Sequence, residues 1–256
     1  MDEELEKFWR SGSYWGDLKM IPFISYQRKS NMKCIYCGAA ADTREHCPSK
    51  TFLEPPLPTN LIVLPACNRC NNGFSSDELY VKTLLNVIRK KRAGVETLDE
   101  FDRPEERDAV VSADRLLKME GQIRDPKVER ILLKLAIGHA AYELSELLLD
   151  DWNGCLETID YVWRPQIDET DWDSLSAPVN IKDGVLPEVG ARSYRNIYVA
   201  VDGDGKSMLV DWNEVQPGSY KYITYYDDEK LIVKMIIKDL LYSQVVFSKS
   251  VTFGIQ

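Results

Sequence analysis

The sequence predicts an α+β protein, because two helical patterns between residues 75 and 149 precede a series of short alternating strand patterns. Residues 75–92 begin with serines and acidic residues, which suit a helix N-terminus, and they end before a glycine. Residues 126–149 begin with a proline, which is favoured in a first helical turn, and they place apolar residues on one face. We expect two helices here, with His139 as a hydrogen-bonded core residue of the second.

The chain after residue 194 predicts an antiparallel β-meander. Five runs rich in β-branched and aromatic residues are separated by Asp-Gly, Pro-Gly and Asp-Asp turns. The segment 205–207, Gly-Lys-Ser, resembles the end of a phosphate-binding loop, but it joins two of these runs and is expected to be a hairpin turn. Residues 165–190 are acidic and contain proline, so a long surface connection is expected there, with the acidic run 168–173 solvated.

Length and charge limit the classes of function. A chain of 256 residues can bury a core without disulfide bonds, and its net charge of −9 argues against coating of nucleic acid by bulk charge. The charge is uneven: residues 1–92 carry a net charge of +4 and the remainder carries −13. We therefore expect an anionic partner to bind the first third. No apolar run suits a membrane span and the N-terminus lacks a signal pattern, so we expect no membrane partner and a cytoplasmic location.

Four of the six cysteines form two Cys-x-x-Cys pairs. These are Cys34 with Cys37 and Cys67 with Cys70. A doubled pair of this kind in an intracellular chain is typical of a tetrahedral zinc site with four thiolate ligands. An iron–sulfur cluster uses the same ligand type and is the less favoured alternative. We therefore predict structural Zn²⁺ at these four cysteines.

The segment between the two pairs has a recognisable order. Glu45 and His46 are followed by a proline, Asn60 opens an apolar run, and Asn71 directly follows the last cysteine of the second pair. This order resembles the HNH nucleases, also called the ββα-metal fold, and within them the zinc-containing branch that includes phage endonuclease VII-type resolvases. The resemblance covers about residues 30–95. It implies a zinc-stabilised ββα-metal module over residues 1–95, followed by a helical and β-rich accessory domain over residues 96–256.

The resemblance implies hydrolysis of phosphodiester bonds by a metal-dependent endonuclease, with DNA as the favoured substrate. His46 matches the general base that activates water, and Asn60 matches the residue that orients this base. Glu45 and Asn71 match the ligands of the catalytic cation. Imidazole suits a base near neutral pH, and carboxylate and amide oxygens suit Mg²⁺ or Mn²⁺. Two departures from the family pattern are Glu at position 45, where Asp is commoner, and Asn rather than His at position 71.

Further expectations concern the partners of this module. Lys50 and Arg69 lie close to the motif and are expected to contact the nucleic-acid backbone. Small proteins that resemble this one often belong to phage-defence or mobile-element systems, so an ATPase or sensor subunit is a candidate partner. The competing hypothesis is a non-catalytic zinc module that binds nucleic acid or protein. Nucleophilic attack by Cys47 is disfavoured, because adjacent residues in a strand point apart.

Overall fold

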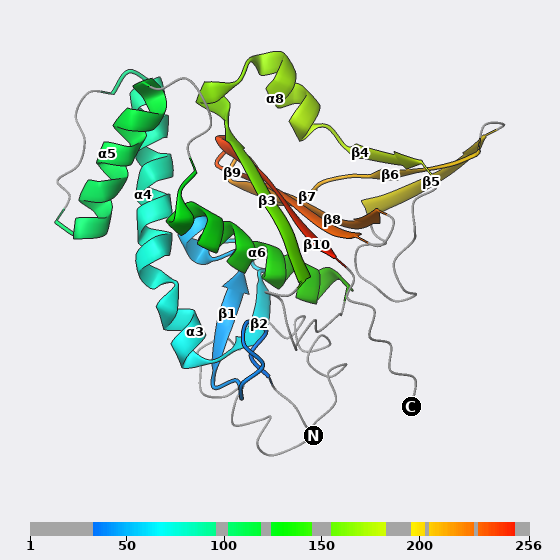
Figure 1. Cartoon of the computed structure of the whole chain (residues 1–256), viewed down its shortest axis with the longest axis horizontal. Coiled ribbons are helices and arrows are strands. Elements are labelled where there is room, and N and C mark those ends of the chain that lie inside the picture. Colours follow the sequence, from blue (N-terminus) through cyan, green and yellow to red (C-terminus); the bar gives the residue numbers. More distant parts are fainter. Residues whose placement is uncertain are drawn as a thin grey trace.

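The computed structural model describes residues 33–95, 102–118, 124–144, 155–182, 196–202, 205–227 and 230–248. Residues 1–32 lie outside these ranges. The same holds for the helix end expected at residues 145–149 and for most of the second half of the connection expected at residues 165–190. The chain is α+β, as predicted, with its longest described helices before residue 145 and antiparallel sheets towards the C-terminus (Figure 1). None of the described helices is both long and apolar enough to cross a lipid bilayer.

The described residues 33–95 form a unit that we call the cysteine module. Strand β1 (Thr43–Cys47) pairs with strand β2 (Ile62–Ala66) in an antiparallel hairpin, and a short 3-10 helix (Lys50–Phe52) lies between them. Helices α3 (Asn68–Gly73) and α4 (Ser75–Arg92) follow directly. The order of elements in the cysteine module is therefore strand, strand, helix.

Three long helices lie beside this hairpin and the large sheet. Helix α4 occupies the predicted range 75–92, although Phe74 rather than a serine is its N-cap residue. Helix α5 (Pro104–Lys118) packs along α4, and helix α6 (Pro126–Leu144) begins at the predicted proline. Figure 1 shows α6 between the β1–β2 hairpin and the large C-terminal sheet. Helix α6 thus contacts both halves of the molecule.

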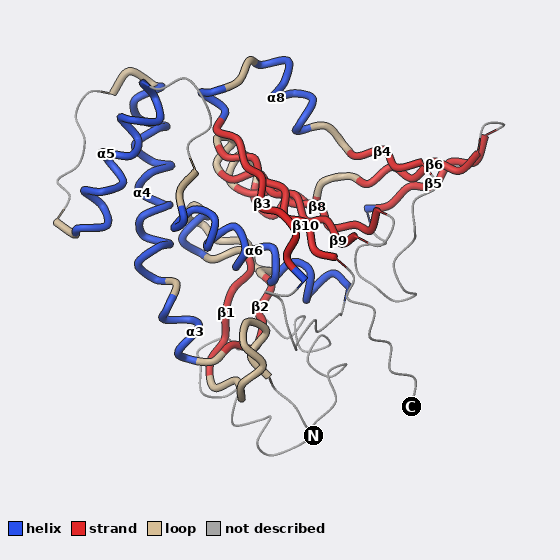
Figure 2. The backbone as a smooth tube through the Cα atoms, viewed as in Figure 1, coloured by secondary structure: helices blue, strands red, loops and turns tan. Residues whose placement is uncertain are grey.

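The C-terminal half contains two sheets, shown as red tubes in Figure 2. A five-stranded sheet has the order β3-β10-β9-β8-β7 and a three-stranded sheet has the order β4-β6-β5, and every pairing is antiparallel. Alternate residues of β8, β9 and β10 pack towards α6, and the others pack towards the three-stranded sheet and helix α8. The strands are β3 (Leu156–Trp163), β4 (Val179–Lys182), β5 (Ile197–Asp202), β6 (Gly205–Val210), β7 (Asn213–Gln216), β8 (Tyr220–Asp227), β9 (Lys230–Ile237) and β10 (Leu241–Ser248).

The prediction of a surface connection over residues 165–190 is wrong for residues 165–182. A 3-10 helix (Arg164–Gln166), helix α8 (Glu169–Ser176) and strand β4 occupy residues 164–182. Asp168 is the N-cap residue of α8, and its carboxylate accepts a hydrogen bond from the backbone N–H of Asp171 at 2.8 Å. Part of the acidic run therefore caps a helix. The hairpin turn expected at residues 205–207 is wrong in position, because these residues are the first three of β6 and Gly205 pairs with Asp202 of β5.

One continuous cluster of buried apolar side chains runs from the cysteine module through α4, α5 and α6 to the five-stranded sheet. The division expected near residue 95 therefore does not separate two independent cores. Gly138 makes the close packing possible, because a Cβ atom at this position of α6 would lie 2.5 Å from the Sγ atom of Cys47 in β1. The Cys47 thiol also contacts the carbonyl oxygen of Leu135, at 3.6 Å. Helix α6 is thus packed directly against β1.

Candidate metal centre and polar cleft

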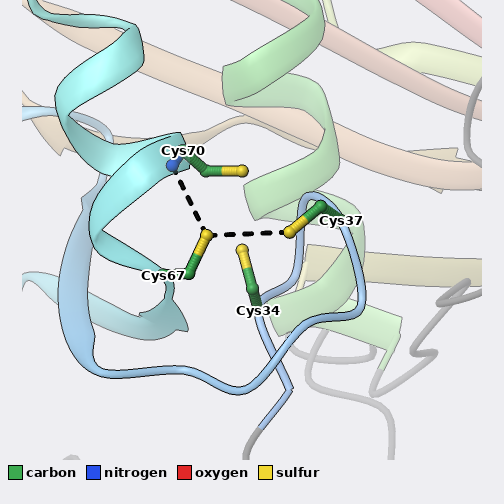
Figure 3. A group of neighbouring side chains, drawn as sticks. All are labelled: Cys34, Cys37, Cys67 and Cys70. Atoms are coloured by element: carbon green, nitrogen blue, oxygen red, sulfur yellow. Dashed lines mark hydrogen bonds between the residues drawn. The ribbon is translucent and has the colours of Figure 1, made fainter.

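The two Cys-x-x-Cys pairs meet at one end of the hairpin (Figure 3). The first pair lies on a tight turn, where Gly38 has a φ of 71° and its N–H donates to the carbonyl oxygen of Cys34 at 2.9 Å. The second pair lies on the first turn of α3, with Cys67 as the N-cap residue. These two local turns direct all four thiols towards a common point.

The geometry of the four sulfur atoms fits a metal ion such as zinc. The ligand atoms lie within 4.8 Å of one another, and Sγ of Cys37 lies 3.6 Å from Sγ of Cys67. Four sulfurs arranged tetrahedrally at about 2.3 Å from a zinc ion would lie about 3.8 Å apart. The backbone N–H of Cys70 donates to Sγ of Cys67 and lowers the pKa of that thiol, whereas burial raises the pKa of Cys34. The four cysteines therefore form a cluster that can hold a metal ion.

A polar cleft of about 530 Å³ opens beside this cluster, between β1, the 3-10 helix at residues 50–52 and the first turns of α3 and α4. Three of the four residues assigned by the HNH resemblance line it, namely Glu45, His46 and Asn71. The lining consists of Asp42, Thr43, Arg44, Glu45, His46, Ser49, Lys50, Thr51, Asn71 and Glu78. We call this space the polar cleft.

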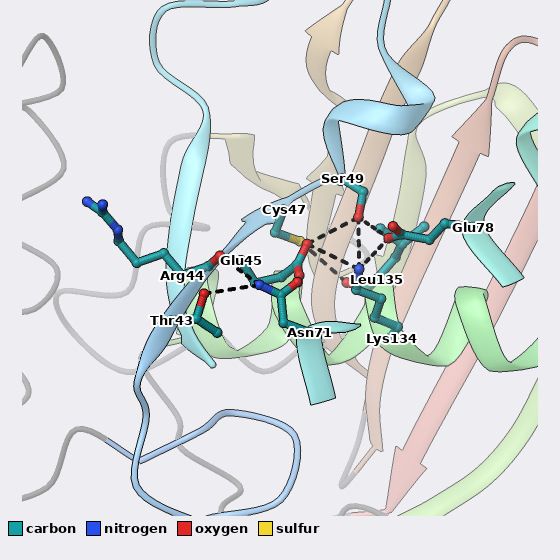
Figure 4. A network of polar contacts seen from close by, with 9 residues as sticks. All are labelled: Thr43, Arg44, Glu45, Cys47, Ser49, Asn71, Glu78, Lys134 and Leu135. Atoms are coloured by element: carbon teal, nitrogen blue, oxygen red, sulfur yellow. Dashed lines mark hydrogen bonds and ion pairs between the residues drawn. The ribbon is translucent and has the colours of Figure 1, made fainter. Parts of the chain in front are cut away.

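Glu45 lies at the floor of the polar cleft with only 6% of its surface exposed. Its Oε1 atom accepts hydrogen bonds from Lys134 Nζ at 3.1 Å and from Ser49 Oγ at 3.2 Å (Figure 4). Lys134 is also buried and forms a second ion pair with Glu78. Burial raises the pKa of Glu45, and the neighbouring Lys134 ammonium acts in the opposite direction. The carboxylate is therefore held by a charged partner from α6.

His46 lies on the same cleft beside two cationic side chains. Burial lowers its pKa to about 4, and the positive charges of Lys50 and Arg44 contribute to this shift. The imidazole is therefore neutral at pH 7, which is the form that can accept a proton. Cys47, the next residue, is 2% exposed, and burial raises the pKa of its thiol well above the usual value. This environment is unsuited to a nucleophilic thiolate.

The two candidate asparagines occupy different places. Asn71 Nδ2 donates to the carbonyl oxygen of Arg44 at 3.1 Å and to Thr43 Oγ1 at 3.3 Å, so the amide is fixed against β1. With Nδ2 engaged in this way, the amide oxygen is the atom of Asn71 that suits a cation. Asn60 is exposed and lines a second pocket of about 360 Å³ on another part of the surface. The structure therefore does not bring Asn60 to the polar cleft.

The expected contacts to a nucleic-acid backbone also differ in position. Lys50 lines the polar cleft, whereas Arg69 is exposed on α3 between the two cysteines of the second pair and does not line the cleft. Asn72, the neighbour of Asn71, is exposed and donates to Asn68 Oδ1 at 2.6 Å. Only one of the two adjacent asparagines therefore belongs to the cleft.

Sequence reasoning missed three residues of this site, which are Ser49, Glu78 and Lys134. Glu78 lies in the acidic first turn of α4 and also lines the cleft. Lys134 lies three positions after Ile131, on the apolar face of α6, and a lysine in such a place was the available signal. His139, on the same helix, donates or accepts one hydrogen bond with Tyr220 at 2.8 Å, while its Nδ1 atom has no hydrogen-bond partner.

Comparison with known proteins gives no match to a family model, a curated protein or a solved structure at a significant level. The chemistry of the polar cleft must therefore be inferred from its own residues.

Proposed function

We propose that this protein is a metal-dependent nuclease that hydrolyses phosphodiester bonds within nucleic acid at the polar cleft. The observation that carries the proposal is the meeting of Glu45, His46 and Asn71 on one cleft, beside a four-cysteine cluster and within a strand–strand–helix arrangement. His46 acts as the general base, and Glu45, Asn71 and the added residue Glu78 bind one Mg²⁺ or Mn²⁺ ion. When bound, this cation takes up negative charge on the leaving oxygen.

The charged side chains of the polar cleft support binding of a phosphate backbone. Arg44 and Lys50 lie near His46, while Asp42, Glu45 and Glu78 provide negative charge. With Lys134 included, these formal charges cancel, so a divalent cation would make the cleft positive. We therefore expect binding of the phosphate backbone to depend on the cation, which agrees with the net negative charge of the whole chain.

The lining of the polar cleft also favours a duplex substrate. Among the described residues that line it there is no Phe, Tyr or Trp, and the ring of His46 is assigned to the chemistry. Proteins that bind single strands without sequence preference commonly stack bases on aromatic side chains, whereas backbone contacts suffice for a duplex. We propose duplex DNA as the substrate and little dependence on base sequence.

The test is a plasmid-nicking assay with zinc-loaded protein and a panel of divalent cations. Wild-type protein is expected to nick in Mg²⁺ or Mn²⁺, and His46→Ala should lose at least about 100-fold of the rate because it lacks the base. Asn71→Ala is expected to need more cation, and Asn72→Ala, at the exposed neighbouring position, is the matched control. Equal rates for wild type and His46→Ala would overturn the proposal.

A second candidate function is a non-catalytic zinc module that binds nucleic acid or protein. The observation that favours it is the ion pair of Glu45 with Lys134, which already neutralises this carboxylate. This candidate predicts stoichiometric zinc and retention of nucleic acid, with no cleavage in any cation of the panel. It also predicts that His46→Ala binds nucleic acid as wild type does.

The proposed context follows from the metal chemistry. The six cysteines lie within the described residues and none is in a disulfide, which suits a reducing compartment such as the cytoplasm. We propose structural zinc at the four-cysteine cluster and a role in phage defence or mobile-element maintenance, with an ATPase or sensor subunit as partner. Co-purification of such a subunit with the tagged protein from its native cells tests this part.

A further inference from the structure

We infer that Lys134 is a positioning residue of the polar cleft, which holds the carboxylates of Glu45 and Glu78 side by side so that they can bind one cation together. The inference rests on the proposed function, because it assigns a residue to the same site. Lys134 belongs to α6 and lies 89 positions after Glu45, outside the segment that resembles the HNH nucleases. The accessory region thus supplies part of the site.

The burial of Lys134 shows that its ammonium is committed to this network. The residue is 2% exposed, and an ammonium group removed from water is costly unless it is paired. Its three N–H donors are matched by three acceptors: Oε1 of Glu45, Oε1 of Glu78, and Oγ of Ser49 at 2.9 Å. Because every donor is used, Lys134 acts through the carboxylates and not by direct contact with a substrate.

The two carboxylates converge on the same pair of groups (Figure 4). Glu45 and Glu78 both contact Lys134 Nζ and both contact Ser49 Oγ through their Oε1 atoms. Two carboxylates this close repel each other, and the ammonium between them offsets the repulsion. Their Oε2 atoms lie outside this network and can provide the oxygen ligands that Mg²⁺ or Mn²⁺ prefers. Lys134 therefore fixes the spacing of two candidate ligands.

Packing on both sides of α6 fixes Lys134 itself. On one side, Gly138 allows close contact with Cys47 of β1, and the Cys47 thiol contacts the carbonyl oxygen of Leu135 next to Lys134. On the other side, α6 packs on β8, β9 and β10 of the five-stranded sheet. The sheet thereby holds the helix that positions the cleft carboxylates, although it lies on the far side of α6 from the cleft.

The test is substitution of Lys134 by methionine, which has a similar length and no charge. The matched control is Lys127→Met on the same helix, where the lysine side chain is 39% exposed, pairs with Asp108 at 3.5 Å, and lies with its ammonium 4.4 Å from the centroid of the Tyr80 ring. Mn²⁺ binding to the zinc-loaded proteins is followed by electron paramagnetic resonance, and plasmid nicking gives kcat and KM. We expect Lys134→Met to raise the Mn²⁺ dissociation constant at least about 10-fold and to lower kcat, with KM for plasmid changed less than about threefold. Lys127→Met should match wild type in all three.

Two results would overturn the inference. Unchanged Mn²⁺ affinity in folded Lys134→Met would show that the carboxylates do not need the lysine. Tighter Mn²⁺ binding would show that the ammonium occupies the place of the cation instead of preparing it. A merely structural role would lower the melting temperature without moving the Mn²⁺ dissociation constant of the folded fraction.

A second variant keeps the inference testable if Lys134→Met does not fold. Ser49→Ala removes the hydroxyl that joins the two carboxylates and changes no charge, and we expect a smaller rise, about twofold to fivefold, in the Mn²⁺ dissociation constant. If wild-type protein binds Mn²⁺ but cleaves no nucleic acid, the proposed function is wrong. The Mn²⁺ dissociation constants of wild type and Lys134→Met still test the role of Lys134 in that case. Wild-type protein that binds no Mn²⁺ would defeat both.

Discussion

The cysteine module and the five-stranded sheet stabilise their strands by different means. In the module, two strands of five residues each are joined at one end by the four-cysteine cluster and covered by α6. In the sheet, strands β8, β9 and β10 are buried on both faces, by α6 on one side and by the three-stranded sheet and α8 on the other. A two-stranded hairpin buries too little apolar surface to be stable alone. We therefore expect the module to depend on a metal ion at the four-cysteine cluster and on its neighbour α6, and the sheet to depend on its own packing.

The largest expected effect separates these two kinds of stabilisation. Removal of the metal by a chelator should abolish amide-exchange protection in residues 33–74 and leave it in β8, β9 and β10. Structural zinc contributes on the order of 10 kcal/mol in small modules, which the short hairpin cannot replace. Exchange measured by mass spectrometry on the full chain reports both regions at once.

The matched variants for this experiment are two cysteine substitutions. Cys67→Ser removes one ligand of the cluster, whereas Cys155→Ser changes a buried cysteine at the start of the sheet region. Zinc content should fall well below one ion per chain only in Cys67→Ser. Equal loss of protection in both regions after chelation would show that the two are stabilised together and would remove the distinction.

A smaller effect is expected where the two regions meet. Gly138→Ala places a Cβ atom against Cys47 Sγ, and overpacking of this kind costs about 1–3 kcal/mol of unfolding free energy. This is notable because alanine otherwise favours a helix over glycine by about 1 kcal/mol. Urea denaturation measures the change.

Two variants sharpen this second prediction. Gly73→Ala at the end of α3 is the control, because its Cβ atom would lie at an ordinary 3.7 Å from the Arg130 side chain, so no loss of stability is expected. Combining Gly138→Ala with Cys47→Ala should recover part of the loss, since the clashing sulfur is gone. A stabilised Gly138→Ala protein would mean that α6 and β1 are not in close contact.

The smallest effect concerns His139, on the sheet side of α6. Burial lowers its pKa to about 3, so below pH 6.5 the unfolded chain takes up a proton that the folded chain does not. Stability should therefore fall with decreasing pH, with a slope for this one group that approaches about 1.4 kcal/mol per unit well below pH 6.5. His46, whose pKa is also lowered, adds to the slope of the wild type.

The variant His139→Phe isolates this contribution. Urea denaturation between pH 6.5 and 5.5 should show a shallower loss in His139→Phe than in wild type, and the difference over this interval should be about 1 kcal/mol, because the unfolded histidine is only half protonated at pH 6.5. The variant also loses the hydrogen bond to Tyr220, which lowers its stability at every pH without changing the slope. Parallel slopes would show that His139 becomes protonated in the folded protein.

The features that sequence predicted are those determined over short distances along the chain. Each cysteine pair lies on one turn, and α4, α6, β5, β6, β8, β9 and β10 follow local periodicity, so their approximate positions were predictable. The four-residue strand β7 lies outside the five predicted runs. Strand β3 was missed because few of its residues are buried, and α8 was missed because only Trp172 of its eight residues is buried. Weak amphipathic patterns of this kind do not distinguish an element from a loop.

Prediction of the residues that line the polar cleft was also restricted to those close together in the sequence. Glu45, His46 and Asn71 follow a motif within 27 positions and were identified from it. Glu78 and Lys134 meet Glu45 only through the packing of α4 and α6 on the hairpin, at separations that no local pattern encodes. The expected role of Asn60 depends on a loop path, and the structure places this residue on another pocket.

The position of Lys134 on α6 has a consequence for protein synthesis. The ribosome completes the metal-binding turns, Glu45 and Glu78 before it adds the 56 residues that lead to Lys134. At about 5–20 residues per second, this delay is roughly 3–11 seconds. During this interval the nascent chain lacks the lysine that we propose positions the two carboxylates, so the proposed nuclease would gain full activity only after α6 has emerged and packed.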